Sequence, residues 1–284
     1  MTIAETGTLL LAAGFVLDGV AAAAAAADRR TELVRYGDVQ VEVVIDGNGP
    51  AIVVLPSLAR DSDDYDEVAE GLAAAGFRVL RPKPRGIGRS TGPMTGISLH
   101  DLARDIAEVI RKFGDGKAVV AGHAYGNWVA RMTAADHPGL VRGVAIVAAA
   151  SKQYPAELSA AVTAAGNPSL SDEQRLAALR FGFFAPGNDP AVWLKGWHPE
   201  IRDSQRAAAA AVKQSEWWSG GTAPLLDLQA ANDPFKPESK RNEMKDEFGS
   251  RVTVMVIPNA SHALIPEQPK AVVEALRQWI GSLP

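Results

Sequence analysis

The chain has 284 residues, which suits one large α/β domain, and its 47% hydrophobic and 22% charged residues are ordinary values for a globular protein. This composition excludes collagen-like, disordered and disulfide-scaffold classes. The absence of cysteine also excludes thiolate nucleophiles and Cys-ligated metal sites. A net charge of −4 argues against a nucleic-acid partner, because a phosphate backbone requires a basic surface.

Residues 1–30 form an Ala-rich N-terminal segment that we keep apart from the fold. The apolar run at 9–17 is too short to span a bilayer, so we expect no stable membrane insertion. Alanines at 21–27 follow it, as in a secretion signal, but Glu5 and Asp18 carry the wrong charge and no Lys or Arg precedes the run. Two interpretations stay open. A signal remnant would place the protein in the periplasm or outside the cell, and an Ala-rich helix would leave it in the cytoplasm.

From residue 31 the chain alternates strand-like and helix-like segments. Residues 51–55 (AIVVL) are typical of a strand buried on both faces, and 99–113 carry an apolar stripe at helical spacing. Strands are predicted at 32–36, 39–45, 51–55, 77–80, 117–121, 141–148, 223–228 and 252–257. Helices are predicted at 63–75, 99–113, 125–135 and 271–280. This alternation predicts a mostly parallel, eight-stranded sheet flanked by helices, whose first two strands form a hairpin at Gly37-Asp38.

Residues 151–221 interrupt this pattern. They contain helical stretches at 155–165, 171–180 and 200–214 but no clear strand signal, and they hold four of the six tryptophans. We therefore expect an α/β core at 31–150 and 222–284 with a helical cap at 151–221. Aromatic side chains suit an apolar pocket, so some of these rings are expected to contact a substrate.

The segment 119–128 (VVAGHAYGNW) carries the strongest chemical signal. An apolar strand leads into Gly122, Ala124 and Gly126, and a helix follows. In a nucleophile elbow the middle residue occupies a strained strand-to-helix turn, and glycines two positions away allow the backbones to approach closely. The usual middle residue is serine, but this chain has Ala124.

With this motif in place, the chain resembles the α/β-hydrolase family from about residue 32 to its end. Five segments match in the family's order: 55–60 (LPSLAR), 81–90 (RPKPRGIGRS), 119–128, 230–237 (AANDPFKP) and 259–269 (NASHALIPEQP). The resemblance implies that Asp233 is the acid and His262 the base, with Asp227 as an alternative acid. It also implies, by position, that the backbone N–H groups of Leu58 and Tyr125 form the oxyanion hole.

Ala124 departs from the family pattern, because it has no hydroxyl to start serine-type acyl transfer. Three explanations stay open: an engineered knock-out, a natural serine-less branch, and a non-catalytic descendant that binds a small molecule. In the natural branch, His262 and Asp233 would act as a general base on water or on a substrate proton.

Other residues are weaker candidates. Ser57 borders the expected oxyanion loop, where it is either a substrate contact or an ordinary loop serine. His123 is expected to be structural, and the cations at 81, 83, 85 and 89 are expected either to attract an anionic substrate or to lie in a solvated loop. The substrate-binding candidates are Ser57, Trp193, Trp197, His198, Trp217 and Trp218.

The sequence thus predicts an esterase-like hydrolase that acts on a small, largely apolar or aromatic ester or acyl compound. No cofactor and no metal are expected, since no His/Asp/Glu cluster has metal-ligand spacing. As written, the chain is expected to be inactive or to use a mechanism without serine. The alternatives are a general-base lyase, isomerase or cofactor-free oxygenase that uses His262 and Asp233, and a small-ligand-binding protein without turnover.

Overall fold

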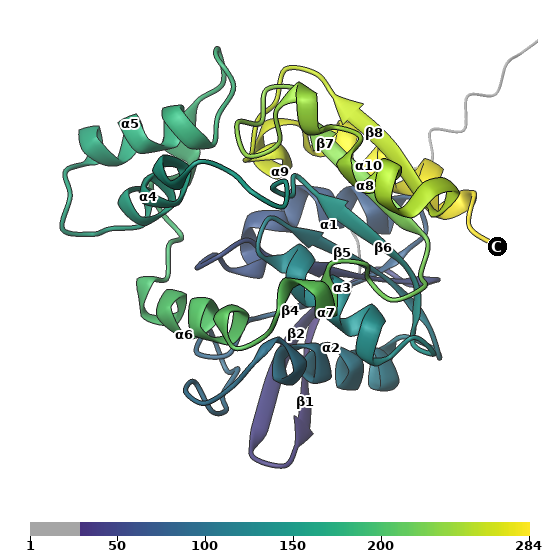
Figure 1. Ribbon diagram of the computed structural model, residues 1–284. Helices are drawn as coiled ribbons and strands as arrows, with labels where there is room; N and C mark the ends of the chain where they lie inside the picture. The colour runs from purple at the N-terminus through teal and green to yellow at the C-terminus, as the bar shows by residue number, and fades with distance from the viewer. Residues whose placement is uncertain (1–28) are drawn as a thin grey trace, which may run out of the picture.

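The computed structural model describes residues 29–284, which form one eight-stranded sheet with helices on both faces (Figure 1). The strands are β1 Arg30–Tyr36, β2 Val39–Asp46, β3 Ala51–Leu55, β4 Arg78–Pro82, β5 Ala118–His123, β6 Val141–Val147, β7 Leu225–Ala230 and β8 Val252–Ile257. Their order across the sheet is β1-β2-β4-β3-β5-β6-β7-β8. The β1–β2 and β2–β4 pairs are antiparallel and the others are parallel, which confirms the predicted sheet.

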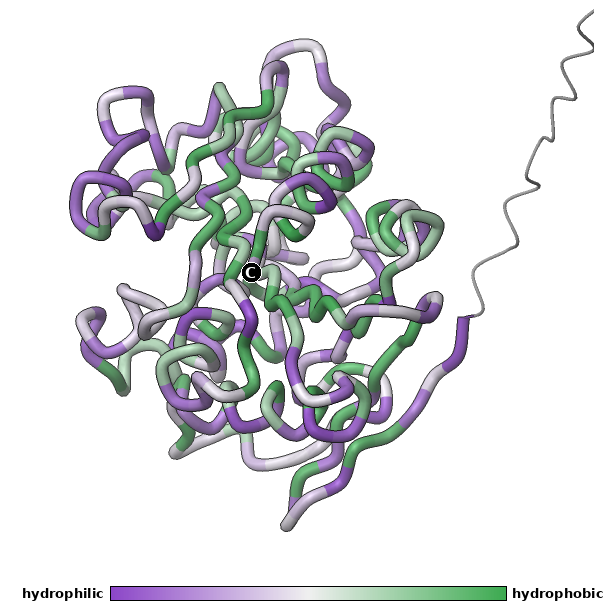
Figure 2. Tube along the Cα trace, turned by 90° about the vertical axis from the view of Figure 1, so that its right-hand side faces the viewer, coloured by the Kyte–Doolittle hydropathy of each residue, from purple (hydrophilic) through white to green (hydrophobic). Residues whose placement is uncertain are grey.

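Two apolar layers attach helices to the sheet. Helices α2 (Leu99–Phe113), α3 (Gly126–Asp136) and α8 (Glu243–Phe248) pack in one hydrophobic cluster, and α1 (Asp66–Ala74) and α10 (Pro269–Gly281) pack in the other. In Figure 2 hydrophobic stretches of the chain run through the interior, and many of the outer turns are hydrophilic. Because the strands from β4 to β8 are parallel, their carboxyl ends lie at one edge of the sheet, which is where ligands bind in open α/β folds.

Four helices lie between β6 and β7: α4 Ala156–Ala165, α5 Asp172–Gly182, α6 Pro199–Ala210 and α7 Gln214–Trp217. Figure 1 shows α4 and α5 standing away from the sheet, with α6 below them. The single helix predicted at 200–214 is wrong, because the chain breaks after Ala210. The rings of Trp217 and Trp218 then pack against Arg131 of α3, and this tertiary contact overrides the helical preference of the alanines.

The sequence did not predict the short helices α8 and α9 (Leu264–Glu267). Single 3₁₀ turns lie at Ser62–Tyr65, Pro190–Trp193, Glu238–Lys240 and Gly249–Arg251. The segment 1–28, and with it most of the predicted N-terminal segment, lies outside the described residues. Within 29–284, none of the helices has the length and apolar character needed to cross a membrane.

The backbones approach closely at the turn between β5 and α3. Ala124 has φ of 46°, in the left-handed region that favours glycine. A Cβ at Gly122 would lie 2.3 Å from the Gly126 carbonyl oxygen, and one at Gly126 would lie 2.6 Å from the Leu55 carbonyl oxygen. The two glycines let α3 start directly above β3 and β5, and this close packing holds position 124 at the strand ends.

We expect Gly122→Ala to lower the free energy of unfolding by about 3 kcal/mol, since its methyl group would overlap backbone atoms that cannot move independently. Urea unfolding of the variant measures this loss. Gly139→Ala is the matched control, because a Cβ there meets no atom within 4 Å. Equal stability of the two variants would contradict the close approach.

Candidate active site

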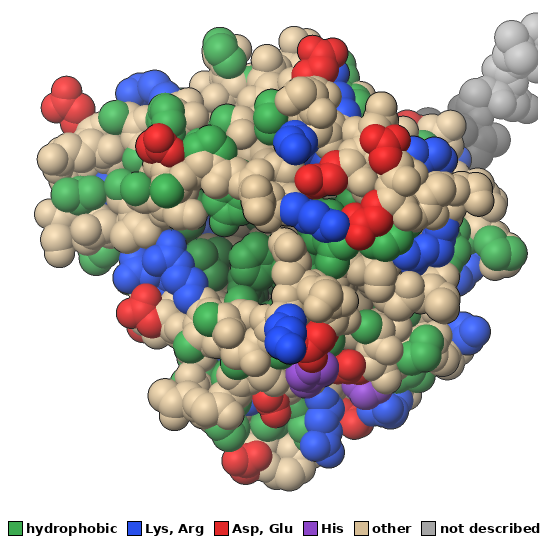
Figure 3. Space-filling model, in the orientation of Figure 1, with side chains coloured by type: hydrophobic (Ala, Val, Ile, Leu, Met, Phe, Trp, Pro, Cys, Tyr) green, Lys and Arg blue, Asp and Glu red, His purple; other side chains and the backbone are tan. Residues whose placement is uncertain are grey.

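A cavity of about 740 Å³ lies at the carboxyl ends of the strands, between the sheet and the helices α4 and α6. Ser57, Leu58, Ala124, Tyr125 and His262 form its inner end. Figure 3 shows the hollow, with hydrophobic side chains along its walls and Lys and Arg side chains at its rim. Five of the candidate residues, from three separate parts of the sequence, therefore share one cavity.

The structure brings His262 and Asp233 together. His262 Nδ1 lies 2.9 Å from Asp233 Oδ2, and both side chains are buried. Asp233 Oδ1 accepts a second hydrogen bond from the Phe235 amide at 2.8 Å, and the Phe235 ring stacks on the imidazole with centroids 4.0 Å apart. Since the carboxylate accepts from Nδ1–H, the lone pair of His262 lies on Nε2, which has no partner among the described residues.

Asp227 is not part of this pair. Its carboxylate is buried and accepts from Lys236 Nζ at 2.5 Å and from Gln229 at 2.9 Å. The alternative acid is therefore committed to an ion pair away from His262.

Two backbone amides at the inner end of the cavity are free. Neither the Leu58 nor the Tyr125 N–H donates a hydrogen bond to any group in residues 29–284, whereas the neighbouring amides of Ser57 and Ala59 are both bonded. Leu58 and Tyr125 both line the cavity beside Ala124. Unpaired amides that face a cavity are suited to bind a ligand oxygen.

A buried chain of hydrogen bonds joins the two loops at this end. The Ser57 N–H donates to the Tyr65 hydroxyl at 2.9 Å, that hydroxyl lies 2.8 Å from His123 Nδ1, and His123 Nε2 lies 2.7 Å from the His262 carbonyl oxygen. A carbonyl only accepts, so Nε2 carries the proton and Tyr65 donates to Nδ1. His123 is thus a neutral, structural histidine that links the Ser57 loop to the His262 loop.

Burial, reinforced by the nearby His262, lowers the pKa of His123 from 6.5 to about 3. Below pH 6.5 this histidine is therefore protonated in the unfolded chain but stays neutral in the folded chain. The free energy of unfolding falls as the pH is lowered through this range. We expect the free energy of unfolding to drop by about 2 kcal/mol from this residue between pH 7 and pH 5. His123→Gln, whose amide can keep both hydrogen bonds, should show a correspondingly smaller drop in urea unfolding at the two pH values. Identical drops would contradict this assignment.

A second buried network reaches the Ala124 carbonyl from α3. Asn127 donates its side-chain N–H to that carbonyl and accepts from Arg131 Nη2. The Arg131 guanidinium carbon lies over the rings of Trp217 and Trp218, 4.6 and 4.5 Å from their centroids. Burial lowers the pKa of Arg131 to about 9. Asn127 and Arg131, which do not line the cavity, thus hold the carbonyl of the strained turn from within the fold.

The predicted aromatic contacts divide into two groups. Trp197, Trp217 and Trp218 line the cavity, as does Ser57. The prediction for Trp193 is corrected, because its ring is buried among His123, Phe183 and Phe184 and beneath the Arg60 guanidinium. The prediction for His198 is corrected too. Its ring lies outside the cavity at the start of α6, where Nδ1 lies 2.9 Å from Glu200 Oε1.

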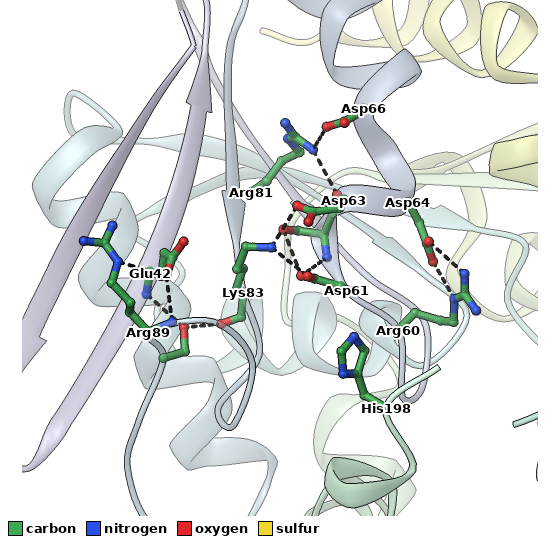
Figure 4. Close-up of polar contacts among 12 residues, drawn as sticks. Glu42, Arg60, Asp61, Asp63, Asp64, Asp66, Arg81, Lys83, Arg89 and His198 are labelled. Carbon is green, nitrogen blue, oxygen red and sulfur yellow. Dashed lines mark hydrogen bonds and ion pairs between the residues drawn. The ribbon is translucent and has the colours of Figure 1, made fainter. Parts of the chain in front are cut away.

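The cations of the 81–90 loop form ion pairs with carboxylates (Figure 4). Arg81 pairs with Asp46 and Asp66, and Lys83 pairs with Asp61 and Asp63. In the same way Arg85 pairs with Asp105 and Arg89 with Glu42. These pairs neutralise the loop, so it is neither a free anion site nor, except at Arg89, a solvated face. Within 29–284, no three His, Asp or Glu side chains are grouped so that they could hold a metal ion.

Several residues that position the candidate site belong to no motif in the sequence. Tyr65, Phe235 and Gln205 reach the candidate site residues through tertiary contacts. Asn127 contacts Ala124 from the first turn of α3, and Arg131 contacts Trp217 and Trp218. Only the Asn127–Arg131 spacing of four residues on one helix was visible beforehand.

The fold and the position of these residues define a member of the α/β-hydrolase class, and comparison with known proteins agrees. The family model described as "alpha/beta hydrolase fold" matches residues 50–203, so the chain belongs to this family. A 2-(acetamidomethylene)succinate hydrolase from Mesorhizobium japonicum is 23% identical over 269 residues, which cover 88% of this chain and 94% of that protein. A soluble epoxide hydrolase from Corynebacterium sp. is 32% identical over 108 residues, or 38% of this chain and 37% of its own length. The crystal structure of the esterase RhEst1 from Rhodococcus sp. superposes with a TM-score of 0.72 at 23% identity, covering 90% of this chain and 99% of the esterase, which shows the shared fold.

Proposed function

We propose that this protein has the site of an esterase-like hydrolase for a small, largely apolar ester or acyl compound, with Ala124 at the nucleophile position. The observation that carries the proposal is the His262–Asp233 pair, at 2.9 Å, in the same cavity as Ala124 and the free Leu58 and Tyr125 amides. The family membership and the hydrolases among the relatives support it.

In this proposal Asp233 orients His262, and Nε2 acts as the general base. Because Ala124 has no hydroxyl, water is the nucleophile. Its oxygen attacks the acyl carbon, Nε2 takes its proton, and the Leu58 and Tyr125 amides donate to the oxyanion. The imidazolium then returns the proton to the leaving oxygen as the bond from carbon to that oxygen breaks. Without a covalent nucleophile such a site retains roughly 10³–10⁴ over the uncatalysed rate in serine-protease precedents.

A second candidate is a general-base enzyme that needs no serine, and the methyl group of Ala124 beside an intact base favours it. His262 would then take a proton from a carbon or hydroxyl of the substrate. This candidate predicts an activity that His262→Ala abolishes and Ala124→Ser does not improve. A binding protein without turnover predicts saturable quenching of the cavity tryptophans and no product.

The test is a rate comparison on chromogenic aryl and alkyl esters. It uses the parent chain, Ala124→Ser, and Ala124→Ser combined with His262→Ala. A gain from serine that depends on His262 supports the hydrolase proposal. If serine brings no gain on any ester, the proposal fails and the general-base and binding candidates remain.

A further inference from the structure

Arg206 is a cation on the wall of the cavity without a carboxylate partner. It is half-buried in α6, and its one hydrogen bond within 29–284 is the one from Nη2 to Thr163 Oγ1, at 3.0 Å. A guanidinium has five N–H donors in a planar fork, so most of its donors are available. By contrast, the cations of the 81–90 loop all have carboxylate partners.

The wall around Arg206 leaves room for a ligand. Ala209 and Ala210, one turn further along α6, also line the cavity, so the guanidinium stands beside two small side chains. On the facing helix α4, Thr163 donates its hydroxyl proton to the Ser159 carbonyl at 3.1 Å and accepts from Arg206. The hydrogen bond between Arg206 and Thr163 therefore links α6 to α4 without neutralising the charge of the guanidinium.

The charge balance of the lining is positive. Among residues 29–284, the cavity is lined by Lys152 and Arg206 but by no Asp or Glu. Lys152 is paired with Glu247, at 2.7 Å. Asp233 lies behind His262 and does not line the cavity. Arg206 is thus the one charged side chain of this lining without a counter-ion, and a bound anion would supply one.

Gln205 fixes α6 relative to the inner end of the cavity. Its side-chain oxygen accepts from the Ala59 amide at 2.8 Å, and its carbonyl accepts from the Tyr125 hydroxyl at 3.0 Å. Ala59 follows Leu58, and Tyr125 itself carries the second free amide. Arg206 is therefore held in a defined position with respect to Ala124 and His262, as a specificity residue must be.

We propose that Arg206 binds a carboxylate of the substrate, so that the cavity accepts a monocarboxylate with an apolar body. One unpaired guanidinium matches one negative charge, and its fork matches the two carboxylate oxygens. The tryptophans of the lining would contact the apolar body. This inference rests on the proposed function only for the position of the reacting group, which would lie at the His262 end; the binding itself requires no turnover.

The test is equilibrium binding, followed by quenching of the cavity tryptophans. The probes are phenylacetate, 3-phenylpropanoate and 4-phenylbutanoate, each compared with its neutral amide. We expect at least one carboxylate to bind about 10- to 100-fold more tightly than its amide, as for a charge-assisted hydrogen bond in a partly buried site. Arg206→Gln should remove this preference, and Arg206→Lys should retain part of it. Arg180→Gln, an equal charge change on the exposed side of α5, should leave it unchanged.

The outcomes separate this inference from the hydrolase proposal. If no carboxylate is preferred, or if Arg206→Gln keeps the preference, the role of Arg206 is overturned even where Ala124→Ser hydrolyses neutral esters. If the preference depends on Arg206 while no variant hydrolyses any ester, the hydrolase proposal fails and the carboxylate site stands. Melting temperatures of all three variants confirm that they are folded.

Discussion

Ala124→Ser is expected to raise ester hydrolysis by roughly 10²–10⁴-fold over the parent chain, because it supplies a covalent nucleophile where none exists. The turn already has the required shape, with φ of 46° at position 124 and its amide bonded to the Val147 carbonyl at 3.0 Å. The added hydroxyl replaces only a hydrogen of a methyl group that lines the cavity. Steady-state rates with p-nitrophenyl esters of increasing chain length, together with a burst of p-nitrophenol, would measure the gain.

Ala150→Ser is the matched control for this variant. Position 150 also lines the cavity but lies beyond the end of β6, away from the strained turn. A hydroxyl there should leave the rate at the parent level. If both serines raise the rate equally, the gain comes from general polarity of the cavity and not from a nucleophile.

In the Ala124→Ser background, His262→Ala is expected to remove the gain, with a loss of roughly 10²–10⁴-fold in kcat. Serine is a weak nucleophile at neutral pH, and Nε2 of His262 is the base at this end of the cavity that can take its proton. Asp233→Asn should cost less than His262→Ala, because it changes the orientation and tautomer of the base without removing it. Single-turnover rates of acylation separate this loss from a change in binding.

His198→Ala provides the control for the loss of an imidazole. This side chain pairs with Glu200 outside the cavity, so its removal should leave both kcat and KM near those of the Ala124→Ser variant. A serine variant that remains fast without His262 would require a different base and would contradict the assignment.

The fold was predictable because its signals are local. The apolar run of β3 and the helical stripe of α2 have the predicted bounds, Ala51–Leu55 and Leu99–Phe113, since five apolar residues in a row and a 3.6-residue period each specify one element. The break between α6 and α7 was not predictable. It depends on where Trp217 packs on α3, and a continuous run of alanines favours helix regardless of that contact.

Only part of the candidate site was predictable from the sequence. Motif order identified Ala124, Asp233 and His262, and the structure places all three at one end of the cavity or directly behind it. Trp193 and His198 were misjudged because a large ring indicates burial or an interface but not the direction in which it points. Arg206 belongs to no sequence motif, and its lack of a carboxylate partner is a property of the tertiary structure alone.

The hydrogen-bonded chain from Ser57 through Tyr65 and His123 to the His262 carbonyl has a consequence for how this protein can change. It connects the two loops at the inner end of the cavity, so we expect a substitution that displaces either loop to disturb the other as well. The opposite wall lies on α4 and α6 and holds several small side chains beside Arg206, among them Ala160, Ala209 and Ala210, whose replacement would alter the length and width of the cavity. We therefore expect relatives with this arrangement to differ mostly in the residues of α4 and α6 that line the cavity. Such differences would change the range of ligands that fit, while the inner end of the cavity stays the same.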